Sequence, residues 1–201
     1  MPWCRRIRRP QLIRGNRQLL FDGMRVSEAA VLVLKNKSHS VTASITVPAS
    51  GATGVIITQG GRAGGWALYA HEGRLKYCYN FLGIVHHVVA ADEPIASGTH
   101  QVRMEFAYDG GGLGKGGDVT LYYDGNPVGK GRVDQTQPFA FSADESCDVG
   151  ADSGSPASPD YGPKGNRFTG EIHWVQIDVG EDSHEHLVTS DARLKIAMAR
   201  Q

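Results

Sequence analysis

Four acidic residues stand close together in a segment that contains no basic residue. Asp144, Asp148 and Asp152 recur every four residues, and Glu145 lies beside the first of them. Calcium is bound by several oxygen ligands, and carboxylates gathered in one loop can supply them. The spacing therefore raises the hypothesis of a calcium site at the rim of the fold. The alternative, which we favour, is an ordinary solvated acidic loop.

Two groups of histidines are candidate metal ligands. His86 and His87 are adjacent and lie near an expected strand, where neighbouring side chains point to opposite faces and cannot hold one ion together. His184 and His186 flank Glu185 in an acidic stretch and could bind a divalent ion weakly. No third ligand stands at a suitable spacing, so we interpret this stretch as a solvated connector.

The glycine-rich segment DGGGLGKGGD contains a dinucleotide-binding spacing. Gly112, Gly114 and Gly117 satisfy GxGxxG, but the motif requires a following helix whose N-terminus meets the pyrophosphate. Here the expected strand Val119–Tyr123 follows, so we interpret the match as accidental. The chain also lacks a GxSxG elbow and any recognisable set of nucleophile, base and orienting group. We predict no catalytic residue.

Aromatic side chains could stack on a sugar if several were exposed together. Alternation along the strands places most of them in the core instead, so the carbohydrate-binding residues, if there are any, stay unassigned. The aromatic residues considered are Trp66, Tyr69, Tyr77, Tyr79, Tyr122 and Trp174.

The elements that must position these residues are short strands with period-two alternation of apolar and polar side chains. Glu72-Gly73 and Asp124-Gly125 are expected hairpin turns, the second being a strong signal for a two-residue turn. The expected strands are Ser40–Val47, Val55–Thr58, Trp66–His71, Leu75–Phe81, Gln101–Tyr108, Val119–Tyr123, Phe139–Phe141 and Phe168–Val179.

The remaining features are a long loop, an irregularity in the last strand and one expected helix. Ser142–Lys164 is rich in Ser, Gly, Pro and Asp and is expected to be a long loop. In the last strand the apolar phase changes after Trp174, which a bulge or burial on both faces would explain. Thr189 or Ser190 can cap a short terminal helix.

Many short strands with a single helix predict an all-β fold, an antiparallel two-sheet sandwich. We expect residues 1–17 to be a basic, disordered tail and residues 18–188 to form the sandwich. Residues 189–201 should form a helix that docks on the sandwich or on a partner domain, because about three turns are marginal alone.

The charge of the whole chain is balanced, with 21 basic and 21 acidic residues. Six arginines precede the first acid, Asp22, and removing them leaves 15 basic against 21 acidic residues, a charge of −6 for the rest. The balance argues against a protein that binds nucleic acid or an anionic membrane through bulk electrostatics, so neither is expected as a partner.

The three cysteines, Cys4, Cys78 and Cys147, are too few and too far apart for a disulfide framework or a zinc knuckle. The first 18 residues lack the apolar stretch of a signal peptide, and no apolar run approaches the length of a membrane span. A cytoplasmic location is therefore expected.

Long collinear blocks of the sequence, from about residue 18 to the C-terminus, closely resemble the C-terminal region of large bacterial arylsulfatases of the actinobacterial type. The resemblance implies a concanavalin A-like sandwich, related to laminin G and lectin modules. The blocks are Gly23–Ala43, Gly60–Tyr69, Gly73–Gly83, His100–Gly117, Ser142–Gly162, Phe168–Gly180 and Ser190–Gln201.

The chemistry of that family is absent from this chain. Sulfatases act through a formylglycine made from the Cys or Ser of a C/S-x-P-x-R motif, and none of the nine prolines has Cys or Ser two places before it. The resemblance implies a non-catalytic accessory domain or fragment of an arylsulfatase, whose partner is the sulfatase catalytic domain. Two alternatives stay open: a standalone carbohydrate-binding module, and a structural module that packs between domains.

Overall fold

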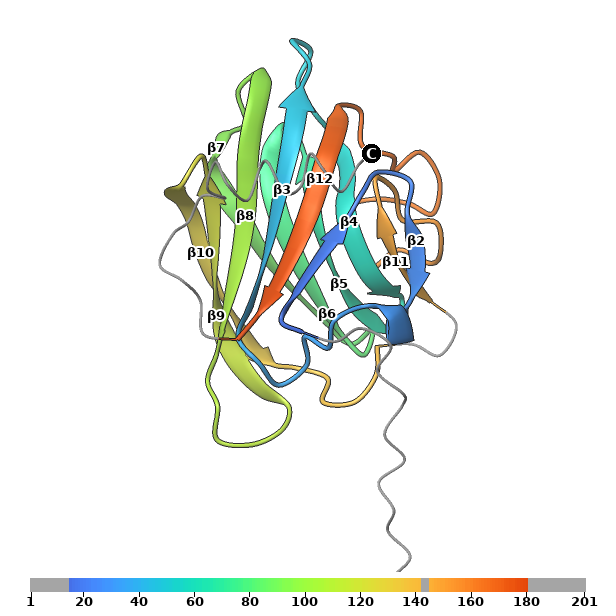
Figure 1. Ribbon diagram of the computed structural model, residues 1–201, viewed down its shortest axis with the longest axis vertical. Coiled ribbons are helices and arrows are strands. Elements are labelled where there is room, and N and C mark those ends of the chain that lie inside the picture. Colours follow the sequence, from blue (N-terminus) through green and yellow to red (C-terminus); the bar gives the residue numbers. More distant parts are fainter. Residues whose placement is uncertain (1–14, 142–144, 181–201) are drawn as a thin grey trace, which may run out of the picture.

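The computed structural model describes residues 15–141 and 145–180, which form two antiparallel sheets packed face to face (Figure 1). The order of the strands across sheet A is β1 (Arg17–Leu20), β12 (Glu171–Val179), β3 (His39–Val47), β8 (Gly98–Tyr108), β9 (Lys115–Tyr123) and β10 (Asn126–Gln135). The order across sheet B is β2 (Arg25–Ser27), β11 (Ser146–Val149), β4 (Gly54–Gly61), β5 (Gly64–His71), β6 (Arg74–Phe81) and β7 (Val85–Pro94).

This architecture confirms the predicted antiparallel sandwich. A single turn of 3₁₀ helix, η1 (Glu28–Ala30), is the only helix among the described residues. The expected C-terminal helix of residues 189–201 and most of the expected tail lie outside the described residues. Strand β1 already begins at Arg17 and pairs with β12. None of the helices in the described part is long and apolar enough to cross a membrane.

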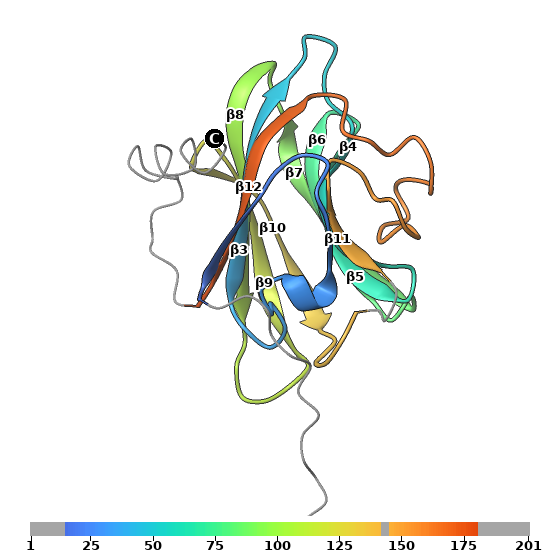
Figure 2. The same cartoon turned by 45° about the vertical axis from the view of Figure 1, so that its right-hand side comes forward.

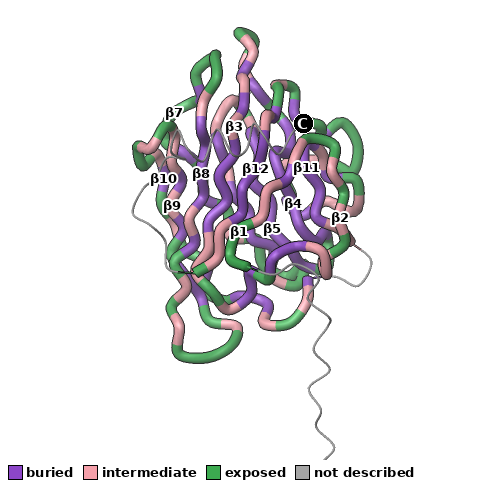
Figure 3. Tube along the Cα trace, viewed as in Figure 1, coloured by how far each residue is buried: buried purple, intermediate pink, exposed green. Residues whose placement is uncertain are grey.

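The core lies between the sheets, where period-two alternation turns one apolar face of each strand inward. On β3 the side chains of Val41, Ala43 and Ile45 are fully buried, as the sequence predicted. Leu68 of sheet B and Met104 of sheet A are likewise buried, and each such side chain contributes about 1.5–3 kcal/mol through its removal from water. Figure 3 shows burial along the middle of the strands and exposure at the turns.

Both predicted two-residue hairpin turns are present. Glu72 and Gly73 have φ of 51° and 73° between β5 and β6, and Asp124 and Gly125 have φ of 48° and 83° between β9 and β10. Two successive positive φ values are typical of the type I′ turn, whose twist matches that of the flanking strands. The registers of both hairpins are therefore fixed locally by the sequence.

Two local predictions are wrong. Phe139–Phe141 is not a strand; it belongs to the connection after β10, where Phe139 is 80% exposed and Phe141 is buried. The expected loop Ser142–Lys164 contains strand β11. The polar composition of that segment concealed a strand because it contributes only Cys147 and Val149 to the core.

Strands β7 and β10 were not predicted, since neither alternates cleanly. Strand β10 contains Pro127 and two glycines, residues that strands usually avoid, but it is an edge strand, where proline is tolerated. Its glycines let it approach β7 closely: a Cβ at Gly129 would lie 2.5 Å from the carbonyl oxygen of Ala90. The two sheets meet at this corner.

The phase change in the last strand is a β-bulge, one of the two explanations offered by the sequence. The pairing of β12 with β3 is irregular between Ile172 and Trp174. Ile172 faces the core, whereas Trp174 packs on the outside of sheet A against Leu19 and Phe21. The bulge allows β12 to bury large side chains on both faces.

Candidate functional site

The outer face of sheet B carries a hydrogen-bonded cluster of polar side chains. Cross-strand neighbours form rows over this face, and one row runs from Asp148 through Thr58, Ala67 and Cys78 to Val88. The first four are at most 5% exposed, whereas Val88 is 42% exposed. The face therefore passes from a covered half to an open half at β7.

The cover is the connection between β11 and β12, residues 150–170, which lies outside sheet B (Figure 2). Within it, Ala157 and Tyr161 pack on Val55, Ala67 and Tyr69 in a small second core. The rings of Tyr69 and Tyr161 meet edge to face with centroids 5.4 Å apart. This contact fixes the connection on the sheet as a wall beside the open half.

A hydrogen-bonded cluster marks the boundary between the wall and the open half. Tyr69 donates from its hydroxyl to Asp160 Oδ2 at 2.7 Å, and Lys76 Nζ donates to the same oxygen at 3.0 Å. The hydroxyl of Ser158 donates to that of Tyr69 at 3.0 Å. We call Tyr69, Lys76, Ser158 and Asp160 the wall cluster.

The electrostatics of the wall cluster keep its carboxylate ionised. Partial burial opposes ionisation of Asp160, but the hydrogen bonds from Tyr69 and Lys76 outweigh it and lower the pKa of the carboxyl. Burial raises the pKa of Tyr69, so its hydroxyl stays protonated and donates. The cluster thus presents a charged carboxylate and an ammonium group, both partly accessible, beside an exposed strip of sheet.

The exposed strip consists of the outward side chains of β7. His86, Val88 and Ala90 are exposed, and they stand in register with Asn80, Cys78 and Lys76 of β6. We call the strip and the wall cluster together the sheet B shelf. A shelf with one hydrogen-bonding wall and a small apolar floor can accommodate a polar ligand that has an apolar face, such as a sugar ring.

Several outward side chains in the middle of sheet A are polar but buried: Thr42 is 0% exposed, Gln176 4% and Arg103 5%. Arg103 donates to Thr42 Oγ1 at 2.8 Å and to Glu105 at 2.7 Å. These groups are held by partners within the chain.

The structure brings together two of the three residues of the calcium hypothesis. Asp148 and Asp152 lie under the base of the wall, whereas Asp144 lies outside the described residues. Asp148 accepts hydrogen bonds from Ser146 and Ser153, and Asp152 Oδ2 accepts from Tyr161 at 2.9 Å.

Burial, with Asp148 close by, raises the pKa of Asp152. Among the described residues no three His, Cys, Asp or Glu side chains gather as a metal site. The two described carboxylates organise the connection, and calcium binding stays a prediction.

The two histidine groups and the GxGxxG spacing do not form sites among the described residues. His86 and His87 point to opposite faces of β7, the first exposed and the second with a buried Nε2, so they do not form a joint ligand pair. Gly112 and Gly114 lie in the loop between β8 and β9, and Gly117 lies within β9, so no helix follows the GxGxxG spacing. His184 and His186 lie outside the described residues.

Most of the aromatic residues are buried, as predicted, and Trp66, Tyr77 and Tyr79 lie in the main core. Trp66, Tyr69, Tyr77, Tyr79 and Trp174 are each at most 6% exposed, and Tyr122 is half-buried. No stacking platform is therefore built from these six side chains.

Sequence reasoning missed the wall cluster. Lys76 and Asp160 are 84 residues apart, and Asp160 stands in a segment without periodicity. The available signal was the alternation of Leu75, Lys76 and Tyr77, which points Lys76 away from the core. Nothing local indicated which distant residue would meet it.

No family model and no curated protein matches the sequence. Solved structures match at the level of fold. The CBM40 module of the Ruminococcus gnavus IT-sialidase, bound to α2,3 sialyllactose, is 15% identical with a TM-score of 0.52, and the match covers 92% of this chain and 96% of that one.

Two longer proteins match as well. The leech intramolecular trans-sialidase is 13% identical with a TM-score of 0.51, and the match covers 87% of this chain and 28% of that one. A NanB sialidase from Streptococcus pneumoniae is 11% identical with a TM-score of 0.57, at 87% and 27% coverage. The chain therefore spans about a quarter of each of these two sialidase chains, and its fold is the jelly-roll sandwich that these structures contain.

Proposed function

We propose that the chain is a non-catalytic carbohydrate-binding module that uses the sheet B shelf. The observation that carries the proposal is the wall cluster, in which the Asp160 carboxylate and the Lys76 ammonium lie 3.0 Å apart and partly accessible. A fixed acceptor beside a fixed donor can engage neighbouring hydroxyl groups of a sugar, and the small floor of Val88 and Ala90 leaves room for the ring. The fold shared with a module bound to sialyllactose supports the proposal.

Isothermal titration calorimetry with sialyllactose, followed by a glycan array, tests it. We expect millimolar or tighter binding that Lys76→Ala weakens about tenfold, since it removes one charge-assisted hydrogen bond. Lys130→Ala is the matched control, because Lys130 is an exposed lysine on β10, a strand of sheet A and not of the sheet that carries the wall cluster. Absence of binding to every glycan at millimolar concentration would overturn the proposal, as would equal loss in both variants.

We further propose that the chain acts beside a sulfatase catalytic domain, the role that its resemblance to the C-terminal region of arylsulfatases implies. The sialidases that contain this fold are much longer than the present chain, which favours an accessory role beside a separate catalytic domain. An accessory module of a sulfatase and a sugar-binding module are compatible roles. Purified protein should not hydrolyse 4-nitrophenyl sulfate, and turnover that a substitution in this chain abolishes would refute the accessory role.

A further inference from the structure

The exposed large apolar side chains gather at one end of the sandwich. We call this the lower end, the bottom in Figure 1; it holds the β6–β7 turn and the β8–β9 loop. Of the seven such side chains among the described residues, only Val88 belongs to the middle of a strand face. The other six are Val33 (38% exposed), Leu82 (48%), Ile84 (75%), Val85 (40%), Leu113 (62%) and Phe139 (80%).

Asn36 ties three of the lower-end segments into one surface. Its side-chain oxygen accepts a hydrogen bond from Gly114 N at 2.7 Å, and its Nδ2 donates to the carbonyl of Pro138 at 2.9 Å. The loop that carries Leu113 and the segment that carries Phe139 are thereby fixed next to each other.

The buried side chain of Asn80 joins the two turns of sheet B at the same end. Its Nδ2 donates to the carbonyls of Gly61 and Arg62, and its Oδ1 accepts from Gly83 N at 2.8 Å. This arrangement positions the turn bearing Leu82 and Ile84 beside Arg62. The apolar tips are therefore held on a rigid base.

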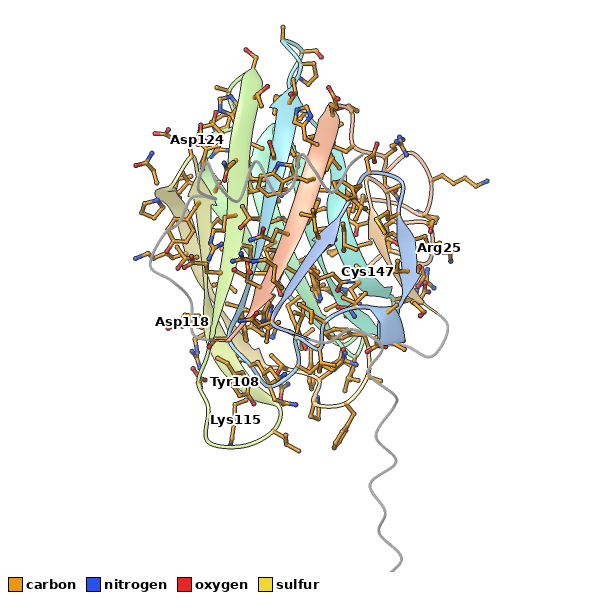
Figure 4. All side chains as sticks on the ribbon, viewed as in Figure 1. Arg25, Tyr108, Lys115, Asp118, Asp124 and Cys147 are labelled. Carbon is orange, nitrogen blue, oxygen red and sulfur yellow. The ribbon has the colours of Figure 1, made fainter. Side chains whose placement is uncertain are left out.

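Charge is distributed unevenly between the two ends. The lower-end segments 31–38, 61–64, 82–84, 109–115 and 136–141 contain four basic residues and a single acid, Asp109, which is paired with Arg132. One of the four, Lys35, is buried and paired with Glu28 of η1. Lys37, Arg62 and Lys115 are exposed and have no ion pair within the described part of the chain. Figure 4 shows Lys115 beside the β8–β9 loop, close to Tyr108.

The opposite end has the reverse character. Its hairpin turns carry Glu72 and Asp124, and among the described residues it exposes no large apolar side chain. The two ends of the described fold thus differ: the lower end is apolar with exposed basic side chains, and the hairpin turns of the other end carry acids.

We propose that the lower end docks on an anionic phospholipid surface. Separate apolar tips on different loops can enter the interfacial region of a bilayer, while the lysine and arginine side chains between them meet the headgroups. A protein partner would be served better by a continuous apolar patch than by isolated tips. This interaction is independent of sugar binding, since the sheet B shelf lies on a face and not at this end.

Vesicle co-sedimentation of the full chain tests the proposal. We expect the protein to bind vesicles of equal parts phosphatidylglycerol and phosphatidylcholine, to release at high salt, and not to bind phosphatidylcholine alone. Ile84→Ser with Phe139→Ser should weaken binding about tenfold or more. Arg62→Gln with Lys115→Gln should weaken it about tenfold at low salt.

Val88→Ser is the control, because Val88 is an exposed apolar side chain (42%) that lies outside the lower end. Thermal melts of all variants show whether the fold is retained. The proposal fails if the wild type ignores anionic vesicles, or if the tip variant binds them as well as the control does. It also fails if the tips instead hold two copies together, seen as a dimer in light scattering that the tip variant disperses without any binding to lipid.

Discussion

The hydroxyl of Tyr69 on β5 donates a hydrogen bond of 2.7 Å to the carboxylate of Asp160, 91 residues further along the chain. This bond fastens the wall of the sheet B shelf to the sheet. Replacing Tyr69 by Phe removes a hydrogen bond to a charged acceptor and leaves Ser158 without its own acceptor, so we expect the free energy of unfolding to fall by about 1–2 kcal/mol. Urea unfolding followed by fluorescence measures it.

Tyr77 offers the matched control. Its hydroxyl is buried and has no hydrogen-bond partner within the described part of the chain. Removing an unsatisfied buried hydroxyl is neutral or stabilising, so Tyr77→Phe should leave the free energy of unfolding unchanged or raise it. Equal losses in the two variants would mean that the Tyr69 hydroxyl contributes nothing specific.

Gly129 sets the distance between the sheets at the corner where β10 meets β7. A Cβ there would lie 2.5 Å from the carbonyl oxygen of Ala90, and backbone at that distance cannot give way cheaply. Gly129→Ala should lower the free energy of unfolding by about 1–3 kcal/mol, the usual cost of overpacking. Lys130→Ala, on the same strand but exposed, should change it by about 0.5 kcal/mol or less in the same urea titration.

The strands that the sequence predicted correctly are those in which apolar and polar side chains alternate along the strand. In β3 the alternation of Val41, Ala43 and Ile45 with polar residues is complete, and in the β9–β10 hairpin Asp124-Gly125 fixes the register locally. Strand β10 has no such pattern. It exists because its glycines fit against β7, a tertiary contact that no local window contains.

The candidate site was less predictable than the fold for the same reason. The outward direction of Lys76 follows from alternation, but its partner Asp160 comes from a segment with no period. The calcium hypothesis rests on the spacing of acidic residues in the sequence. In the structure the carboxylates of Asp148 and Asp152 accept hydrogen bonds from the backbone amides of Ser153 and Ala157. Spacing in sequence did not reveal these competing donors.

The two described thiols should be inert in the folded protein. Burial raises the pKa of Cys78 to about 12, and burial also raises that of Cys147 above its ordinary value. Only the thiolate reacts readily, and neither sulfur is accessible. In a Cys4→Ser background, native protein at pH 8 should not react with Ellman's reagent over minutes, whereas two thiols should react in guanidinium chloride. Rapid labelling of the native protein would contradict the packing of β6 and β11.

Cys147 is protected by its burial in the core and not by Arg25, which lies outside it. The two residues belong to the paired strands β2 and β11, and Figure 4 shows Arg25 at the edge of the molecule and Cys147 nearer its middle. Arg25 Nε donates to Ser146 Oγ at 2.9 Å on the outside, while Cys147 packs in the core. Arg25→Ala should therefore leave the rate of Cys147 labelling about unchanged.

His39 makes the stability of the sandwich depend on pH. It lies beside a small pocket at the lower end, also lined by Lys35, Trp66 and Phe141, and its Nδ1 donates to the carbonyl of Lys37 at 3.0 Å. Its Nε2 is buried without a partner in the described part of the chain. Burial, only partly offset by that hydrogen bond, lowers the pKa of His39 to about 4 from an ordinary 6.5.

The unfolded chain therefore binds a proton at His39 between pH 6.5 and about 4, where the folded chain does not. The stabilising contribution of the neutral imidazole is complete above pH 6.5 and is lost as the pH falls toward 4, amounting to about 3 kcal/mol. Urea unfolding at pH 7.5, 6, 5 and 4.5 should show this decline, and His39→Gln should flatten it by about that amount. His86→Gln, at an exposed position on β7, should leave the slope as it is. Parallel curves for the wild type and His39→Gln would show that His39 is protonated as easily in the folded chain as in the unfolded one.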